Sequence, residues 1–132
     1  MQGKAPSWTI DTKVDIPFSA KLDEYYVNDV SLRMEIYQRL ADALTLEEVE
    51  SIWDEVKDRF GKPPEHAQAL YHLSRIRVFA SQRGFTTVKV DEFSLFYEKK
   101  SGTESITNKI LIGRMSSPKI AEEKVCKILS KH

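Results

Sequence analysis

The stretch "SIWDEVKDRFGKPPE", residues 51–65, decides how the middle of this chain folds. Ile52, Trp53 and Val56 recur at the spacing of a helix with one buried face. Gly61 suits the left-handed conformation that commonly follows a last helical turn. The two prolines after it prevent the helix from continuing, and a proline can open the next helix, where its missing N–H costs nothing. The stretch therefore predicts the end of one helix, a tight stop and the start of another.

Three helices are predicted in the middle of the chain. The first covers residues 30–44, with Asp29 as its N-cap, and the second covers residues 46–60, with Thr45 and Glu48 as a capping box. The third begins after the prolines and stops at Gly84. The residues expected to face the core are Met34, Tyr37, Leu40, Ala41 and Leu44 in the first helix, and Leu46, Val49, Ile52, Trp53, Val56 and Phe60 in the second.

Strands are predicted on both sides of the helices. Residues 8–18 alternate between apolar and polar side chains, which indicates a half-buried strand, and Pro17 places its end or puts it at a sheet edge. Residues 86–90 and 93–100 are β-branched and aromatic runs, which predict a hairpin or two adjacent strands. We expect a loop over residues 101–108 and a short strand over residues 109–115.

A final helix follows, capped by Ser117 and opened by Pro118, with Ile120, Val125 and Ile128 facing inward. The resulting fold class is α+β, with an N-terminal strand, a three-helix segment, a small mostly antiparallel sheet and a C-terminal helix. Residues 1–7 are expected to be a flexible tail or linker stub, and residues 8–132 a single domain.

The composition argues against several classes of protein, namely nucleic-acid-binding, membrane-spanning and disulfide-bonded ones. Twenty basic and twenty acidic side chains cancel, so the net charge gives no footprint for nucleic acid or an anionic membrane. No apolar run approaches the roughly 20 residues that span a bilayer. A single cysteine, Cys126, excludes an intramolecular disulfide and is typical of the reducing cytoplasm. We therefore expect a cytoplasmic protein without membrane contact, and DNA contact is not expected.

Catalytic and metal-binding signatures are absent from the sequence. It contains no GxGxxG, GxxxxGK[ST], GxSxG or HExxH motif. His66 and His72 are six residues apart, which puts them on different faces of a helix, so neither a metal nor a cofactor is expected. Arg75 is positioned to pair with an acidic neighbouring helix, and Cys126 is expected at the core boundary. The sequence predicts no enzyme activity.

The second helix carries the remaining candidate site. Six acids lie between Leu46 and Phe60, against Lys57 and Arg59. Asp58 lies in the last turn, where the helix dipole disfavours an anion. The carboxylates can be a solvated face, with Asp58 paired to Lys62 or Arg59, or a docking surface for a partner's arginine. A third reading, catalytic carboxylates, requires a cleft and perturbed pKa values. The acids that share one stripe are Glu47, Asp54, Glu55 and Asp58.

The motifs "LRMEIYQRLA", "EVESIWDEVKDRFGKPPE" and "SRIRVFASQRGF" point to a family. Residues 14–85, which contain them, resemble the C-terminal domain of bacterial transcription-repair coupling factors, also called Mfd. The "DRFGxPP" stop between two amphipathic helices is the most specific part of the resemblance.

The resemblance implies a regulatory role without catalysis. Family members are ATP-driven DNA translocases that displace stalled RNA polymerase and recruit the excision-repair protein UvrA. Their ATP and Mg sites lie outside this domain. The C-terminal domain docks on an N-terminal UvrB-like module and masks UvrA binding. The family's docking carboxylates fall on Glu55 and Asp58, with Asp54 and Arg59 beside them, and the alternative is an accessory DNA-contacting domain of the same translocase.

Overall fold

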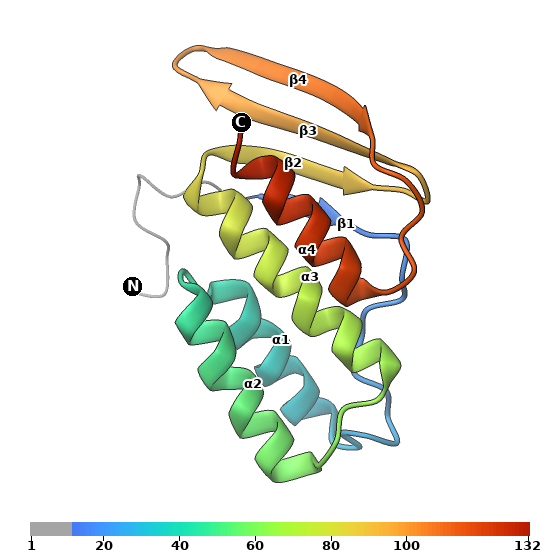
Figure 1. Cartoon of the computed structure of the whole chain (residues 1–132). Helices are drawn as coiled ribbons and strands as arrows, with labels where there is room; N and C mark the ends of the chain where they lie inside the picture. The colour runs from blue at the N-terminus through green and yellow to red at the C-terminus, as the bar shows by residue number, and fades with distance from the viewer. Residues whose placement is uncertain (1–11) are drawn as a thin grey trace.

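The computed structural model describes residues 12–132 and has the predicted order of elements. A four-stranded sheet is covered on one face by two helices, and two further helices pack at the far side of one of these (Figure 1). The elements are β1 (Lys13–Asp15), α1 (Val30–Asp42), α2 (Leu46–Phe60), α3 (Glu65–Gln82), β2 (Phe85–Val90), β3 (Ser94–Ser101), β4 (Glu104–Leu111) and α4 (Pro118–Leu129).

The sheet has the strand order β1-β2-β3-β4. β2, β3 and β4 pair antiparallel, whereas β1 pairs parallel with β2, with Val14 opposite Val88. β1 is an edge strand that ends before Pro17, as the sequence predicts. Only residues 13–15 of the predicted strand are paired, and residues 8–11 lie outside the described part of the chain.

Two apolar cores meet on α3. One lies between the sheet, α3 and α4, and its fully buried residues include Phe85, Leu95 and Val125. The other lies between α1, α2 and α3, with Val49 and Val56 at its centre. Because α3 contributes to both cores, it joins the helical half of the molecule to the sheet half.

The termini of α2 form as predicted. The Glu48 N–H donates to the Thr45 hydroxyl at 3.1 Å, and that hydroxyl donates to the Glu48 carboxylate at 3.3 Å. Gly61 follows the last turn with a φ of 86°, and its N–H donates to the Lys57 carbonyl at 2.9 Å. Trp53 is buried and stacks on Tyr71 of α3. The predicted buried face of α2 is therefore confirmed.

The predicted core face of α1 is confirmed at Leu40 and Tyr37 but wrong at Met34, Ala41 and Leu44. Ile36 and Leu40 are buried, whereas Met34 is 61% exposed, and Ala41 and Leu44 are exposed. The helix carries two overlapping apolar stripes at helical spacing, so periodicity alone does not choose between them. Packing against α2 and α3 selects the stripe that contains Leu32, Ile36, Leu40 and Ala43.

The predicted loop over residues 101–108 is also wrong. β3 ends at Ser101, Gly102 turns the chain with a φ of 65°, and β4 begins at Glu104. β4 is an edge strand whose side chains are nearly all exposed, so it lacks the alternation that identifies a half-buried strand. The turn between β2 and β3 is confirmed, since Asp91 accepts hydrogen bonds from Phe93 N and Ser94 N.

The C-terminal helix is confirmed with its cap. The Ile120 N–H donates to the Ser117 hydroxyl at 3.2 Å, Pro118 opens α4, and Val125 is fully buried. Among the described residues, no helix is both long enough and apolar enough to cross a membrane.

Candidate docking surface

The outer face of α2 carries all four candidate residues. Val49, Trp53 and Val56 take the opposite face into the core, which leaves the charged side chains in solvent. The candidate residues Asp54, Glu55, Asp58 and Arg59 are all exposed. We call Asp54, Glu55 and Asp58 the acidic face of α2.

Glu55 is held by a residue of the neighbouring helix. Arg39 of α1 donates two hydrogen bonds to its carboxylate, Nη1 to Oε2 at 2.6 Å and Nη2 to Oε1 at 3.4 Å. These hydrogen bonds, together with the charge of Arg39, lower the pKa of Glu55. Half of the Glu55 side chain stays exposed. The contact crosses between helices, so spacing within α2 could not have revealed it.

Asp54 and Asp58 differ in their partners. Asp54 pairs with Lys57 of the same helix at 3.5 Å, in an exposed contact that adds little stability. Within residues 12–132, no hydrogen bond or ion pair engages the Asp58 carboxylate, so the alternative of a pair with Lys62 or Arg59 is not formed. Asp58 is thus an acidic residue in the last turn of a helix and forms no ion pair within the described residues.

The end of α2 that carries Asp58 is fixed by an aromatic contact. The Tyr26 hydroxyl donates to the Gly61 carbonyl at 2.7 Å, and its ring meets Phe60 edge-on, with centroids 5.9 Å apart. The Arg59 guanidinium lies 5.2 Å from the Phe60 ring centroid. The backbone that presents Asp58 and Arg59 is therefore anchored to the loop before α1.

A second charged cluster is turned inward. Arg75 of α3 binds Glu122 of α4 through Nε at 2.8 Å and Glu50 of α2 through Nη1 at 2.5 Å. His72 bonds the other oxygen of Glu122 at 2.6 Å, and the Tyr71 hydroxyl donates to Glu50. The prediction that Arg75 pairs with an acidic neighbouring helix is confirmed. His72 is half-buried, not a free surface histidine.

These contacts, together with burial, shift the pKa values of two side chains of the cluster. Burial raises the pKa of Glu122, but the hydrogen bonds from His72 and Arg75 outweigh it, so the pKa is lowered. Burial, with the hydrogen bond to Glu50, raises the pKa of Tyr71. Each side chain of the cluster bonds another member of it, so the cluster is a structural connection between α2, α3 and α4.

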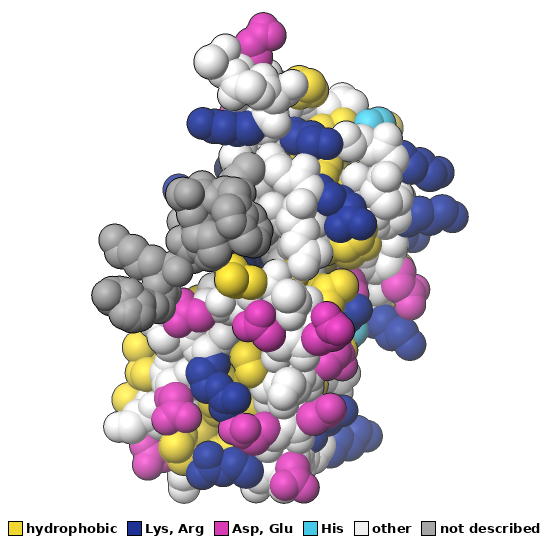
Figure 2. Space-filling view, turned by 90° about the vertical axis from the view of Figure 1, so that its left-hand side faces the viewer, with side chains coloured by type: hydrophobic (Ala, Val, Ile, Leu, Met, Phe, Trp, Pro, Cys, Tyr) yellow, Lys and Arg dark blue, Asp and Glu magenta, His cyan; other side chains and the backbone are white. Residues whose placement is uncertain are grey.

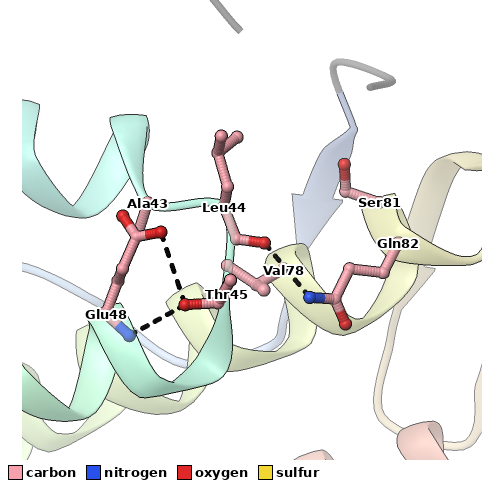
Figure 3. A pocket seen from close by; sticks show the side chains of 7 residues that line it. All are labelled: Ala43, Leu44, Thr45, Glu48, Val78, Ser81 and Gln82. Atoms are coloured by element: carbon pink, nitrogen blue, oxygen red, sulfur yellow. Dashed lines mark hydrogen bonds between the residues drawn. The ribbon is translucent and has the colours of Figure 1, made fainter. Parts of the chain in front are cut away.

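A shallow cavity of about 300 Å³ lies where the α1–α2 turn meets the end of α3 (Figure 3). Its polar groups are engaged: Glu48 bonds Thr45, and Gln82 donates to the Leu44 carbonyl at 3.1 Å. None of the acidic face of α2 lines it. Among the described residues, no group of three or more His, Cys, Asp or Glu is placed to hold a metal ion. Of the α2 carboxylates, only Glu48 lines this cavity, and the acidic face of α2 lies outside it.

Cys126 lies at the core boundary, as predicted. It is partly buried on α4, and burial raises the pKa of its thiol to about 12. The thiolate, which is the reactive form, is therefore scarce at neutral pH.

The profile of the TRCF domain matches residues 16–110. The chain belongs to the TRCF domain family. The match extends the resemblance of residues 14–85 into β4, and it includes all of α1, α2 and α3.

Three relatives are transcription-repair-coupling factors. The chain is 38% identical to that of Mycobacterium bovis over 78 residues, 33% identical to that of Escherichia coli over 81, and 29% identical to that of Bacillus subtilis over 82. These matches cover 59%, 61% and 62% of the chain but only 6%, 7% and 7% of the relatives. The chain thus corresponds to a small part of much longer proteins.

A solved structure has the same fold. The crystal structure of the C-terminal domain of transcription-repair coupling factor superposes with a TM-score of 0.73 and covers 93% of this chain and 94% of its own. The sequences are 11% identical over that match, so the likeness establishes the α+β fold and nothing further.

Proposed function

We propose that this chain is the C-terminal regulatory domain of a transcription-repair coupling factor and has no catalysis of its own. In this role it docks on the UvrB-like module of the same protein and masks the surface that binds UvrA. ATP and magnesium bind elsewhere in the longer protein, and RNA polymerase is an indirect partner. The domain acts in the cytoplasm, in transcription-coupled nucleotide excision repair.

The observation that carries the proposal is the unpaired carboxylate of Asp58. Asp58 and Glu55 are three residues apart, so they project from the same side of α2. The helix dipole disfavours an anion in this last turn. Lys57 and Arg59 lie in the same turn, but no described residue forms an ion pair or hydrogen bond with the Asp58 carboxylate. An arginine from a partner would supply the missing counter-charge.

Because Arg39 bonds only Glu55, the carboxylates of Glu55 and Asp58 differ in how easily a partner can bind them. Glu55 already accepts two hydrogen bonds from Arg39, so a partner's arginine must share or displace that contact. Asp58 can be bound without breaking any contact inside the domain. We therefore expect Asp58 to contribute more to docking than Glu55.

Such docking gives a two-state clamp. The closed form masks UvrA binding, and any partner that binds only the open form shifts the population toward it. A clamp held by a few exposed charge pairs is closed at rest and still released by a competing partner.

The test is titration of this chain with the isolated UvrB-like module. Asp58→Asn is expected to weaken docking about tenfold, which is about 1.4 kcal/mol. Glu55→Gln is expected to weaken it less, and the double variant most. Exposed charges contribute little to folding, so the urea midpoint should stay unchanged.

The matched control removes two exposed carboxylates from the sheet half, Glu92→Gln with Glu104→Gln. The control is expected to dock as the unmodified chain does. Equal weakening by the control, or no effect of the Asp58 and Glu55 variants, contradicts the assignment of the docking surface to α2.

A further inference from the structure

The zero net charge conceals two oppositely charged halves. Residues 12–82 contain nine basic and thirteen acidic side chains, whereas residues 83–132 contain ten basic and six acidic ones. Figure 2 shows this separation: magenta carboxylates cover the lower, helical part of the molecule, and dark-blue side chains dominate the upper part, which holds the sheet and α4.

The basic side chains of the sheet half are not neutralised. No ion pair joins any of the ten Lys and Arg of residues 83–132 to an Asp or Glu side chain of the described chain, although Lys99 bonds the oxygen of His132. In the helical half, by contrast, Arg39 and Lys57 pair with acids. Of the six acids of the sheet half, Glu122 is turned inward and bound to Arg75. The Lys and Arg side chains of α4 and of the end of α3 are thus exposed and form no ion pair with an Asp or Glu side chain of the described chain.

Several of these cations lie at the end of the sheet half where β3 ends, and along α4 from there. We call Arg83, Lys99, Lys100, Lys124, Lys127 and Lys131 the basic end. The Lys99 ammonium donates to the main-chain oxygen of His132 at 2.6 Å, which joins the end of β3 to the end of the chain after α4. The Lys100 N–H donates to the Gly84 carbonyl at 3.1 Å, which places the start of β2 alongside.

The lysines of α4 extend the basic end into a track. Lys124, Lys127 and Lys131 are three and four residues apart, so they share one side of the helix and of the turn that continues it. The helical rise separates them by about 4.5 and 6 Å along the axis. The Lys124 ammonium reaches the carbonyl of Ile112, after β4, so this side of α4 faces the edge of the sheet.

We propose that the basic end binds the phosphate backbone of nucleic acid without sequence preference. A linear series of unpaired lysines matches a chain of regularly spaced phosphates, because each lysine acts as a point charge. A protein partner would need an apolar centre in the interface. Two exposed large apolar side chains lie beside the basic end: Ile106, opposite Lys99 in the sheet, and Leu111, next to the carbonyl that Lys124 reaches. They are five residues apart along β4, so they form no single apolar centre.

The proposal is independent of docking through α2. The acidic face of α2 lies in the helical half, and the basic end lies in the opposite, sheet half (Figure 1). The domain can therefore contact nucleic acid while α2 is engaged. Because the helical half carries an excess of carboxylates, phosphates repel it. This repulsion orients the domain with its sheet half toward the nucleic acid.

The experiment is fluorescence anisotropy of this chain with a labelled 20-base-pair duplex and a 20-nucleotide single strand of unrelated sequence. We expect dissociation constants of about 10⁻⁴–10⁻⁶ M near physiological salt, similar for different sequences. Lys124→Gln with Lys127→Gln and Lys131→Gln should reduce the slope of log K against log salt on duplex DNA by about 2.7, since each phosphate contact contributes about 0.9.

The matched control replaces three lysines of the helical half, Lys21, Lys57 and Lys62, by Gln, and circular dichroism verifies that both triple variants fold. Equal loss of binding in the control would overturn the assignment to the basic end. Binding without salt dependence, or no binding at 50 mM salt, would overturn the proposal. Displacement of DNA by polyglutamate at equal charge concentration would assign the surface to an acidic protein and also overturn it.

Discussion

Replacing Arg75 by Met removes the one side chain that links α2, α3 and α4 through charge. Arg75 and Glu122 are only 23% and 15% exposed, while Glu50 is 44% exposed. Removing one partner of a fully buried pair costs about 3–5 kcal/mol, because the other charge stays buried without compensation. Solvent at Glu50 reduces this, so we expect Arg75→Met to lower the free energy of unfolding by about 2–3 kcal/mol.

The measurement is urea denaturation followed by circular dichroism at pH 7. With a slope of about 2 kcal/mol per molar urea, the midpoint should fall by about 1–1.5 M. The matched variant combines Arg75→Met with Glu122→Leu, which removes both buried charges and should recover part of the loss. A loss below about 0.5 kcal/mol for Arg75→Met, or a double variant much less stable than the single one, would refute the reasoning.

The pH dependence gives a second check on the same variant. The folded-state pKa of Glu122 is lowered, so its stabilising contribution is present above the unfolded pKa of about 4.3 and is lost as the pH falls through the folded value. Without Arg75 only the contact with His72 remains to hold the carboxylate, so the pKa of Glu122 rises and its protonation costs less. The difference in stability between the unmodified chain and Arg75→Met should therefore shrink as the pH falls through the folded-state pKa values of Glu122 in the two chains, first that of the variant and then that of the unmodified chain. A constant difference would contradict the role of Glu122.

Two further predictions concern single side chains of the cores. Trp53 is buried and stacked on Tyr71, so Trp53→Ala should lower the free energy of unfolding by about 3–5 kcal/mol, and an unchanged urea midpoint would show that α2 packs through another face. The pKa of the Cys126 thiol is raised to about 12, so its reaction with a thiol reagent at pH 7 should be far slower than that of free cysteine and accelerate on unfolding in urea. Rapid labelling of the folded chain would contradict this environment.

The sequence predicted best the elements whose signals agree with one another. For α2, the capping box, the 15-residue apolar stripe and Gly61 all indicate the same helix, and both its limits and its buried face are confirmed. For α1, two apolar stripes compete, and the choice between them is made by contacts with α2 and α3 that are distant in sequence. β4 was missed over its first half because an exposed edge strand needs no apolar alternation.

In the candidate site, too, some properties could be predicted from the sequence and others depend on contacts between distant elements. That Asp54, Glu55, Asp58 and Arg59 are exposed follows from the helical period once the core face is known. The partner of Glu55 does not, because Arg39 belongs to another helix whose core face was predicted only in part. The separation of charge was visible in the sequence at residue 83, but the balanced total conceals it when the chain is treated as one unit.

The parallel pairing of β1 with β2 has a consequence for the order of folding. Lys13 pairs with Thr87, 74 positions later, whereas β2, β3 and β4 meet through short turns. Closing a loop of that length costs about 2 kcal/mol more in chain entropy than closing a turn of six residues. The antiparallel hairpins and helices should thus form first, and β1 should join last. During synthesis from the N-terminus, β1 leaves the ribosome before β2, residues 85–90, has been made. The backbone of β1 therefore stays unpaired and in solvent until β2 has emerged.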